Sequence, residues 1–558
     1  MGKAGKVCRH GATYLFPYWL HLYGLIFGIG CKSSVKANGV EKMTKDFLLP
    51  VEKATEAKDG VFAAVQKFRA KNRPALADLR LEITNGLAAS ALDGNAKGAA
   101  RDFGADIGVR VFWGKKIVAG GFAGKSLGIK DFEGIERAAK ELLGTALKRA
   151  KANSAMKEKE MRKFPKEGKG LYSESFANIP IVQKEWHSVF RKSPLETPVE
   201  EFVKRAEGLS AEISKIGGIA TNSISILSFV SRKIFASSEG SLIEQTRTIT
   251  EPSVYVAAKG KANETYHEWI SEQKGLEALE GENSHGKSIE DFARFIAQGT
   301  VELSNAPAIK PVKDAVVVTD PWFNTLLSHE ICGHPSEADR ALKRETAWAG
   351  RAWWFNNVSE NLFGQRVGSE EMTVISNPEI EGYGNYAFDD EGTAGRKVVN
   401  VEKGVLREFM NSRETAQILG QKPNGHMRAS SAQGMPLIRM SNTYFEAGSW
   451  GAKEIIEDTR DGYYIVGEKT PSIGESRQNF NITCWKCFRI ENGEIGQLYR
   501  NAGIEYDSRD LFMSIEAADD VKLFNVPNCG KGTPMQTMRV GNGGPHLRLK
   551  ANITGERE

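Results

Sequence analysis

The chain has 558 residues, of which 41% are hydrophobic and 26% are charged. This composition is typical of a folded globular protein and excludes a disordered, collagen-like or low-complexity chain. Lysine and arginine (75) nearly balance aspartate and glutamate (70), so the net charge of +5 does not indicate nucleic-acid binding. Six cysteines are too few for a disulfide scaffold in a chain of this length, which favours a reducing compartment.

The N-terminal segment differs from the rest of the chain. A basic stretch (residues 3–9) precedes an apolar run (14–30) that ends at Cys31. A basic region followed by an apolar region is the outline of a secretory signal. The run also contains a proline and six aromatic residues, so we interpret residues 1–42 as an extension upstream of a start at Met43. We therefore expect a cytoplasmic protein, and an exported or membrane-anchored protein is the alternative.

Two units of mixed helices and strands are predicted next, over residues 43–170 and 171–314. Helices are predicted where apolar residues recur every three to four positions, and strands where they alternate or form short runs. The lysine-rich stretch over 148–170 predicts a linker, because it contains a proline, two glycines and little aromatic surface. The expected elements are a helix over 46–70, a hairpin over 106–119, a helix over 131–152, a helix over 197–215, strands over 223–235 and 242–257, and a helix over 288–304.

The third unit, residues 315–558, carries short strands and glycine-rich turns and is predicted to be mostly β. The whole chain is therefore predicted to have an α+β fold. The unit opens with a buried strand over 315–319. Asp320 is a good N-cap and Pro321 a good first helical residue, so a helix is predicted to follow and to reach His334.

This helix carries the pattern that indicates chemistry. His329 and His334 offer two imidazole ligands, and Glu330 offers a carboxylate beside them, a combination typical of zinc peptidases. The histidines are five residues apart, about 140° around a regular helix, so they converge only if the helix widens into a π-bulge. Gly333 and Pro335 permit such a distortion. Two unrelated histidines at a helix end are the alternative.

A metal site of this kind needs a third ligand, and four cysteines are candidates. Cys332 lies between the histidines but would diverge from both, so we interpret it as a small buried side chain. Cys484 and Cys487 would point to opposite faces of a strand, which favours ordinary thiols. Cys529 lies in a glycine-flanked segment, expected to be a loop, where nearby Lys531 would favour the thiolate. A free surface thiol is the alternative for Cys529.

The sequence resembles the TldD/PmbA metallopeptidase family over residues 44–558, and in particular its TldD-like branch, which carries the HExxxH motif. Four stretches of sequence carry this resemblance. One such stretch would be weak evidence for the family, but four in the right order are specific. They are residues 329–334, residues 384–392 with the strand and turn over 401–406, residues 424–428 leading into 436–443, and residues 529–532 through to 541–545. Pro335 departs from the small residue that similar sequences carry after the second histidine.

The resemblance implies a zinc ion held by His329, His334 and Cys529, with Glu330 as the general base. It implies a zinc-dependent metallopeptidase that cleaves unfolded or flexible peptides by Glu-assisted attack of a zinc-activated water. Four further side chains are candidates for contacts with the ligands or with substrate, and turn residues are the alternative reading of them. They are Asp389, Asp390, Glu391 and His426.

The resemblance also bears on partners. It implies a homodimer, or a heterodimer with a PmbA-like subunit that lacks the zinc motif. We expect no nucleic-acid partner, and no membrane partner unless residues 1–42 are a genuine anchor. Two rival functions stay open: an inactive scaffold subunit with a vestigial zinc site, and a zinc hydrolase that acts on a non-peptide bond. Glu330 favours an enzyme over a scaffold, because a scaffold does not need a carboxylate beside a metal ligand.

Overall fold

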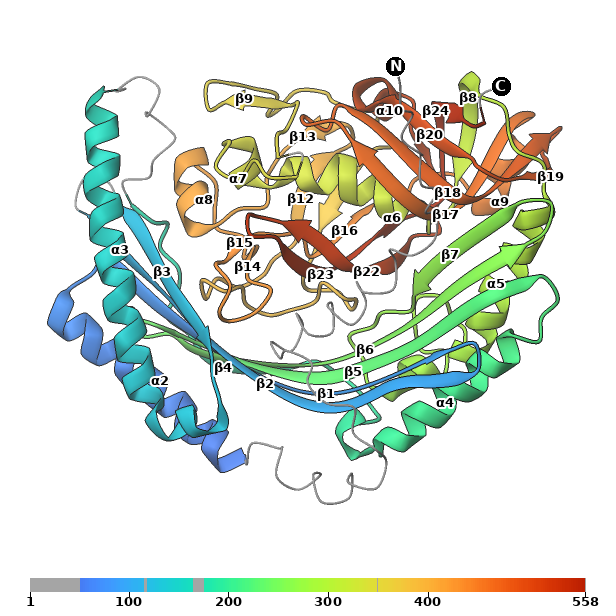
Figure 1. Ribbon diagram of the computed structural model, residues 1–558. Coiled ribbons are helices and arrows are strands. Elements are labelled where there is room, and N and C mark those ends of the chain that lie inside the picture. The colour runs from blue at the N-terminus through green and yellow to red at the C-terminus, as the bar shows by residue number, and fades with distance from the viewer. Residues whose placement is uncertain (1–50, 115–117, 164–174, 349, 557–558) are drawn as a thin grey trace, which may run out of the picture.

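The computed structural model describes residues 51–114, 118–163, 175–348 and 350–556. A long curved sheet runs along one side of the molecule, and the C-terminal half of the chain packs into the curve (Figure 1). The predicted α+β fold class is confirmed. The predicted N-terminal extension, residues 1–42, lies outside the described residues.

The curved sheet has seven strands in the order β3-β2-β1-β5-β6-β4, with β7 paired to β6. All neighbours are antiparallel except β4 and β6, which are parallel. The β1–β5 pairing joins strands from the units predicted over 43–170 and 171–314 into this one sheet. The strands are β1 (Leu76–Leu92), β2 (Asn95–Trp113), β3 (Ala119–Ser126), β4 (Gln183–His187), β5 (Ile219–Ser237), β6 (Leu242–Lys259) and β7 (Asn263–Trp269).

Two pairs of helices cover the two ends of this sheet (Figure 1). Helices α2 (Val51–Asn72) and α3 (Ile135–Lys163) share an apolar core with β1, β2 and β3. Helices α4 (Val199–Ile213) and α5 (Ile289–Asn305) share a second core with the other end of the sheet. The helices predicted over 46–70, 131–152, 197–215 and 288–304 are confirmed in their described parts, with boundaries shifted by a few residues except at the end of α3, which continues to Lys163.

The linker predicted over 148–170 is wrong as far as Lys163, because α3 continues to that residue. Lysine and glutamate are strong helix formers, and ion pairs one turn apart add support, as between Lys163 and Glu160 at 3.2 Å. High charge therefore marks a solvated helix here, and not a break in structure. Residues 164–174 lie outside the described part of the chain.

The C-terminal half contains two larger sheets. One has the order β17-β8-β24-β20-β18-β19 and closes on itself, because β17 also pairs with β18. Its strands are β8 (Val312–Thr319), β17 (Asp461–Ile473), β18 (Asn479–Glu491), β19 (Glu494–Tyr499), β20 (Gly503–Asp507) and β24 (Leu547–Thr554), with β21 (Glu516–Ala517) on β24. The other sheet is ordered β13-β12-β11-β16-β23-β22. Its strands are β11 (Val374–Ser376), β12 (Val398–Glu402), β13 (Val405–Leu406), β16 (Asn442–Phe445), β22 (Lys522–Lys531) and β23 (Gln536–Gly544).

Short elements complete this half. The small strand pairs are β9 (Phe355–Asn357) with β10 (Glu360–Asn361), and β14 (Met427–Arg428) with β15 (Leu437–Ile438). The short helices are α6 (Asn324–Leu327), α7 (Ala338–Ala341), α8 (Arg413–Leu419), α9 (Ala452–Glu457) and α10 (Ser508–Met513). The largest apolar core of the molecule lies between the two sheets and packs against the segment that carries the histidine motif. Across the described residues, every helix is too short or too polar to cross a membrane.

Candidate metal centre

The histidine motif lies where a helix widens. Strand β8 leads into Asp320, whose carboxylate accepts the backbone N–H of Phe323 at 2.7 Å and caps the helical segment as expected. After the short helix α6, residues Ser328–Gly333 form one π-helical turn, in which the N–H of His334 donates to the carbonyl of His329. The predicted π-bulge is confirmed. Residues His334–Ser336 then form a 3₁₀ turn that ends the helix.

The π-turn brings the two imidazoles together. Their ring centroids lie 4.7 Å apart with an interplanar angle of 89°. Gly333 packs closely against Met440, because a Cβ at this position would lie 2.1 Å from the Met440 sulfur and would force that side chain to shift. Cys332 points into the apolar core, as predicted, and burial raises the pKa of its thiol well above the usual range.

The third side chain in this group is Cys529. Its sulfur lies 3.7 Å from Nε2 of His334, and donor atoms of His329, His334 and Cys529 all lie within 4.8 Å of one another. All three side chains are buried. The loop expected around Cys529 is wrong: the residue belongs to strand β22, opposite Met538 on β23. Cys484 and Cys487 lie in the apolar core on β18, away from this group.

Each imidazole is held through its other ring nitrogen. Nδ1 of His329 lies 2.9 Å from Oδ1 of Asn542, and Nδ1 of His334 lies 3.0 Å from Oε2 of Glu337. An Nδ1–H that donates to an oxygen leaves the Nε2 lone pair free to bind a metal, and such partners fix the ring orientation. Asn542 and Glu337 fell within or beside the motif stretches of the sequence, but nothing in the sequence assigned them this role.

Glu337 also anchors a buried charge network. Its Oε2 accepts from Nε of Arg340 at 2.9 Å and from Nζ of Lys531 at 3.0 Å. Lys531 donates in addition to Asp339 at 2.7 Å and to the carbonyl of Ile438 at 2.6 Å. The ammonium of Lys531 is therefore turned toward carboxylates, and it ties the strand that carries Cys529 to the segment that follows His334.

The electrostatics of the three donors suit a cation. Burial alone would raise the pKa of the Cys529 thiol, but His329, Arg439 and His334 hold it well below its usual range. Burial alone would lower the pKa of His329, but the Cys529 sulfur raises it to about 9. A thiolate next to two imidazoles is a donor set that Zn²⁺ prefers, and three protein ligands leave one coordination position open. The residues present therefore fit a zinc ion.

Glu330 follows His329 in the sequence, but its carboxylate is not one of the three grouped donors. Its carboxylate forms an ion pair with Arg477, and the same guanidinium donates to the Glu330 carbonyl at 2.9 Å and to the Trp348 carbonyl at 3.1 Å. The Glu330 side chain keeps 14% of its surface exposed, against 3% for His329 and for His334. Arg477 lies 147 residues away in the sequence, so sequence patterns could not reveal this partner.

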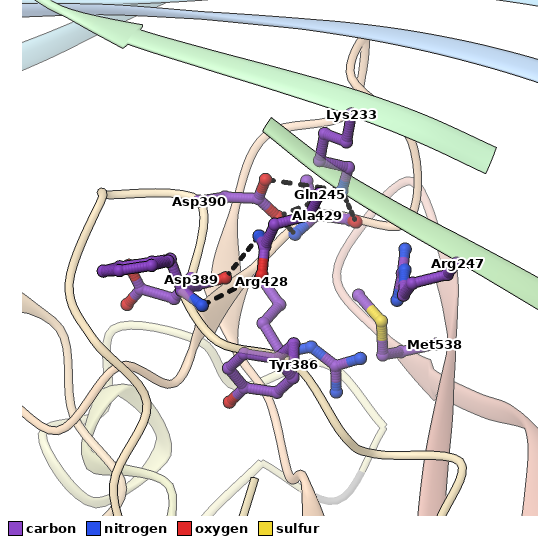
Figure 2. Close-up of a pocket in the computed structure, with 10 residues that line it drawn as sticks. Lys233, Gln245, Arg247, Tyr386, Asp389, Asp390, Arg428, Ala429 and Met538 are labelled. Carbon is purple, nitrogen blue, oxygen red and sulfur yellow. Dashed lines mark hydrogen bonds and ion pairs between the residues drawn. The ribbon is translucent and has the colours of Figure 1, made fainter. Parts of the chain in front are cut away.

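The remaining candidates have structural partners. Asp389 accepts the backbone N–H groups of Glu391 and Thr393 at 2.9 Å and of Met427 at 3.0 Å, which makes it a turn residue. Glu391 pairs with Arg110 on β2 at 3.2 Å and so joins the C-terminal half to the curved sheet. The ring of His426 bonds to the carbonyl of Asn424 and to two serine hydroxyls. Asp390 lines a pocket (Figure 2).

The α+β fold and the buried His/His/Cys group together define a candidate metalloprotein. The comparisons with known proteins make this more specific. Residues 312–555 match the model of the PmbA/TldA metallopeptidase C-terminal domain, and residues 192–303 match the central domain of the same family. The chain therefore belongs to the TldD/PmbA metallopeptidase family, as the resemblance predicted.

Individual relatives agree with this assignment. A protein of Methanothermobacter thermautotrophicus named metalloprotease is 31% identical over 343 residues, which cover 61% of this chain and 71% of the relative. A protein of Saccharolobus solfataricus named zinc metalloprotease TldD homolog is 34% identical over 238 residues, which cover 42% of this chain and 50% of the relative. The crystal structure of TldE from Thermococcus kodakarensis has the same fold, with a TM-score of 0.62 at 17% identity over 89% of this chain and all of that one.

Proposed function

We propose that this protein is a zinc-dependent peptidase in which His329, His334 and Cys529 hold the metal and Glu330 is the general base. The observation that carries the proposal is the buried group of three donors. The Glu330 carboxylate follows His329 directly in the sequence and is not one of the three donors. A bound zinc ion supplies Lewis-acid chemistry, because it lowers the pKa of water and polarises a carbonyl. The name of the Saccharolobus solfataricus relative supports zinc as the metal.

In this proposal the chain's own residues have distinct tasks. Asn542 and Glu337 fix the two imidazole rings, so that both Nε2 atoms face the Cys529 sulfur. Glu330 takes a proton from the attacking water and returns it to the leaving amine. Arg477 holds the Glu330 carboxylate in one orientation while leaving part of it accessible.

Flexible or unfolded peptides are the proposed substrates, because family resemblance implies them. We also propose a cytoplasmic location and a dimer, formed with a second copy or with a PmbA-like subunit. The fold shared with TldE supports a partner of that kind. An inactive scaffold subunit of such a complex is the second candidate, and the presence of Glu330 beside the donor group argues against it.

The test is Glu330→Gln in protein purified without chelator, compared with the parent and with Glu370→Gln, a matched change at an exposed glutamate. The parent and both variants should carry about one zinc per chain, because the three ligands are unchanged. Cleavage of a flexible peptide should fall roughly 10² to 10⁴-fold in Glu330→Gln alone, as is typical for the loss of a general base. Melting temperatures of all three proteins serve as the folding control.

Each other outcome has a definite meaning. A Glu330→Gln protein that loses its zinc would identify Glu330 as a ligand. Normal cleavage by that variant would assign the base to another residue. A parent protein that cleaves no flexible peptide, alone or with a PmbA-like partner, would support the scaffold function.

A further inference from the structure

A small polar cavity lies between the curved sheet and the C-terminal half. Lys233 of β5 and Arg247 of β6 line it from the sheet, while Tyr386, Arg428 and Met538 line it from the opposite side (Figure 2). The cavity volume is about 20 Å³, which leaves room for a small polar group. The Gln245 side chain bonds to the backbone at residues 387 and 388 and fixes this wall of the cavity.

The acidic groups at the cavity already have donors. Both oxygens of Asp389 accept backbone N–H groups. Oδ2 of Asp390 accepts the N–H of Ala429 at 2.6 Å and lies 3.3 Å from Nζ of Lys233. Oε1 of Glu82, beyond Lys233, accepts a hydroxyl at 2.6 Å. The two aspartates therefore have little capacity left to bind a ligand, while Oε2 of Glu82 lies 3.6 Å from Nζ of Lys233 without a hydrogen bond.

The basic groups at the cavity have fewer acidic partners. The nearest carboxylate oxygen to the Arg247 guanidinium, among described residues, belongs to Glu82 at 4.0 Å, beyond hydrogen-bond distance. Arg428 is buried, stacks on Tyr386 at 4.6 Å, and donates to the Met440 carbonyl at 2.6 Å and the Arg539 carbonyl at 3.3 Å. Burial lowers the pKa of Arg428 to about 10, a sign that its charge is poorly compensated. A ligand that accepts hydrogen bonds and carries negative charge would neutralise the charge of both arginines and accept their N–H groups.

The cavity adjoins the metal centre. Met538 lines the cavity and lies directly opposite Cys529 in the β22–β23 pairing, so the two side chains share one face of the ribbon. Asn542, which holds His329, lies four residues further along β23 on the same face. The Cβ atoms of such cross-strand neighbours are about 4.5–5.5 Å apart. Met538 therefore links the cavity to the donor group, and a peptide cleaved there would pass near the cavity.

We propose that this cavity is a subsite that binds a carboxylate of the peptide substrate through Arg247 and Arg428. Planar guanidinium groups pair with carboxylates through two parallel hydrogen bonds, and among the described residues neither arginine has a carboxylate oxygen within hydrogen-bond distance. The carboxylate comes either from the C-terminus of the peptide or from an aspartate or glutamate side chain. This inference rests on the proposed peptidase function and adds a substrate preference to it.

The test uses one flexible, otherwise neutral peptide in four forms. Two forms differ only at the C-terminus, as free acid or amide, and two amidated forms differ only in an internal glutamate or glutamine. Hydrogen bonds to charged groups are worth enough to give about a tenfold or larger gain in kcat/KM for the carboxylate form, chiefly through KM. A gain in the first pair identifies the C-terminal carboxylate as the ligand, and a gain in the second identifies an acidic side chain.

Arg247→Gln should remove this gain, so that the carboxylate and uncharged forms of each pair are cleaved alike. Arg247→Lys keeps the charge without the planar fork and should retain part of the gain. Arg137→Gln, the same change at an exposed helix position, should leave the gain intact. Equal cleavage of both members of both pairs by the parent overturns the proposal, and so does a gain that survives in Arg247→Gln.

Binding separates this proposal from the proposed function. Fluorescence anisotropy of the same labelled peptides with the Glu330→Gln protein measures the carboxylate preference without turnover. If the parent cleaves none of the peptides but the carboxylate forms bind about tenfold tighter, the peptidase function fails and the subsite stands. If all forms bind alike, the subsite fails, whatever the parent cleaves. Arg247→Lys supplies the same comparison if Arg247→Gln does not fold.

Discussion

Glu337→Gln is a sharp test of how the metal centre is held together. One oxygen of Glu337 accepts from His334, Arg340 and Lys531 at 2.9–3.0 Å, while its other oxygen is buried without a hydrogen-bond partner. Glutamine has the same shape and can keep its oxygen in the occupied position. The substitution therefore removes one negative charge and leaves the geometry almost unchanged.

The expected changes in stability and in metal affinity can both be estimated. Arg340 and Lys531 are fully buried, and among the carboxylates of the described residues only Asp339, at 2.7 Å from Lys531, still forms an ion pair with either of them. Removing one partner of a buried ion pair costs about 3–5 kcal/mol. In a cooperative unit of about 250 residues this corresponds to roughly 6–10 °C in melting temperature. Loss of a hydrogen-bond partner behind a ligand histidine typically lowers metal affinity about 10 to 100-fold, and we expect the lower end because glutamine still accepts from Nδ1.

The two effects are measured separately. Thermal unfolding after chelation reports the stability of the metal-free protein, since bound metal adds its own stabilisation. Competition with a chromophoric chelator reports zinc affinity. Glu370→Gln, at an exposed position, is the matched control and should change neither quantity. A metal-free Glu337→Gln protein that melts within about 1 °C of the parent, with the same zinc affinity, would refute the role assigned to the network.

Two further predictions follow from other parts of the structure. Cys529→Ser should lose most of its zinc, measured by elemental analysis, whereas Cys484→Ser should keep it; loss of zinc in Cys332→Ser instead would show that the ligand assignment is wrong. His285 is packed against three aromatic rings, and burial lowers its pKa to about 3, so the unfolded chain binds this proton first as the pH falls below about 6.5. Its neutral form thus makes stability fall by up to about 1.4 kcal/mol per pH unit toward acid. His285→Phe should therefore lose less stability than the parent between pH 7.5 and 5, and an equal loss measured by urea unfolding would contradict this.

The histidine spacing was enough to predict the π-turn, because two ligands five residues apart can share a face only on a widened helix. Gly333 and Pro335 are compatible with this distortion, and the structure has the π-turn at the expected residues. Cys529 could not be chosen from the residues alone, since several thiols were available and its distance from the histidines in sequence carries no geometric information. Family resemblance made that choice, and the structure places Cys529 beside the two histidines.

Other features depend on long-range contacts that local patterns do not carry. Arg477 reaches Glu330 from 147 residues away, and Asn542 reaches His329 from 213 residues away. The basic cavity draws its walls from both halves of the chain, so no single stretch of sequence indicates it. The error over 148–163 has a different origin, because lysine-rich sequence is compatible with a linker and with a solvated helix, and only packing decides.

The separation of the donors along the chain has a consequence for biosynthesis. His334 and Cys529 are 195 residues apart, and β8, just before the histidines, pairs with β17 and β24, which are both made later. At roughly 5–20 residues per second, the ribosome adds the thiolate about 10–40 s after the second imidazole. During that interval the histidines lack both their sulfur partner and the sheet that supports them. The proposed three-donor site is therefore complete only after strand β22 has been synthesised.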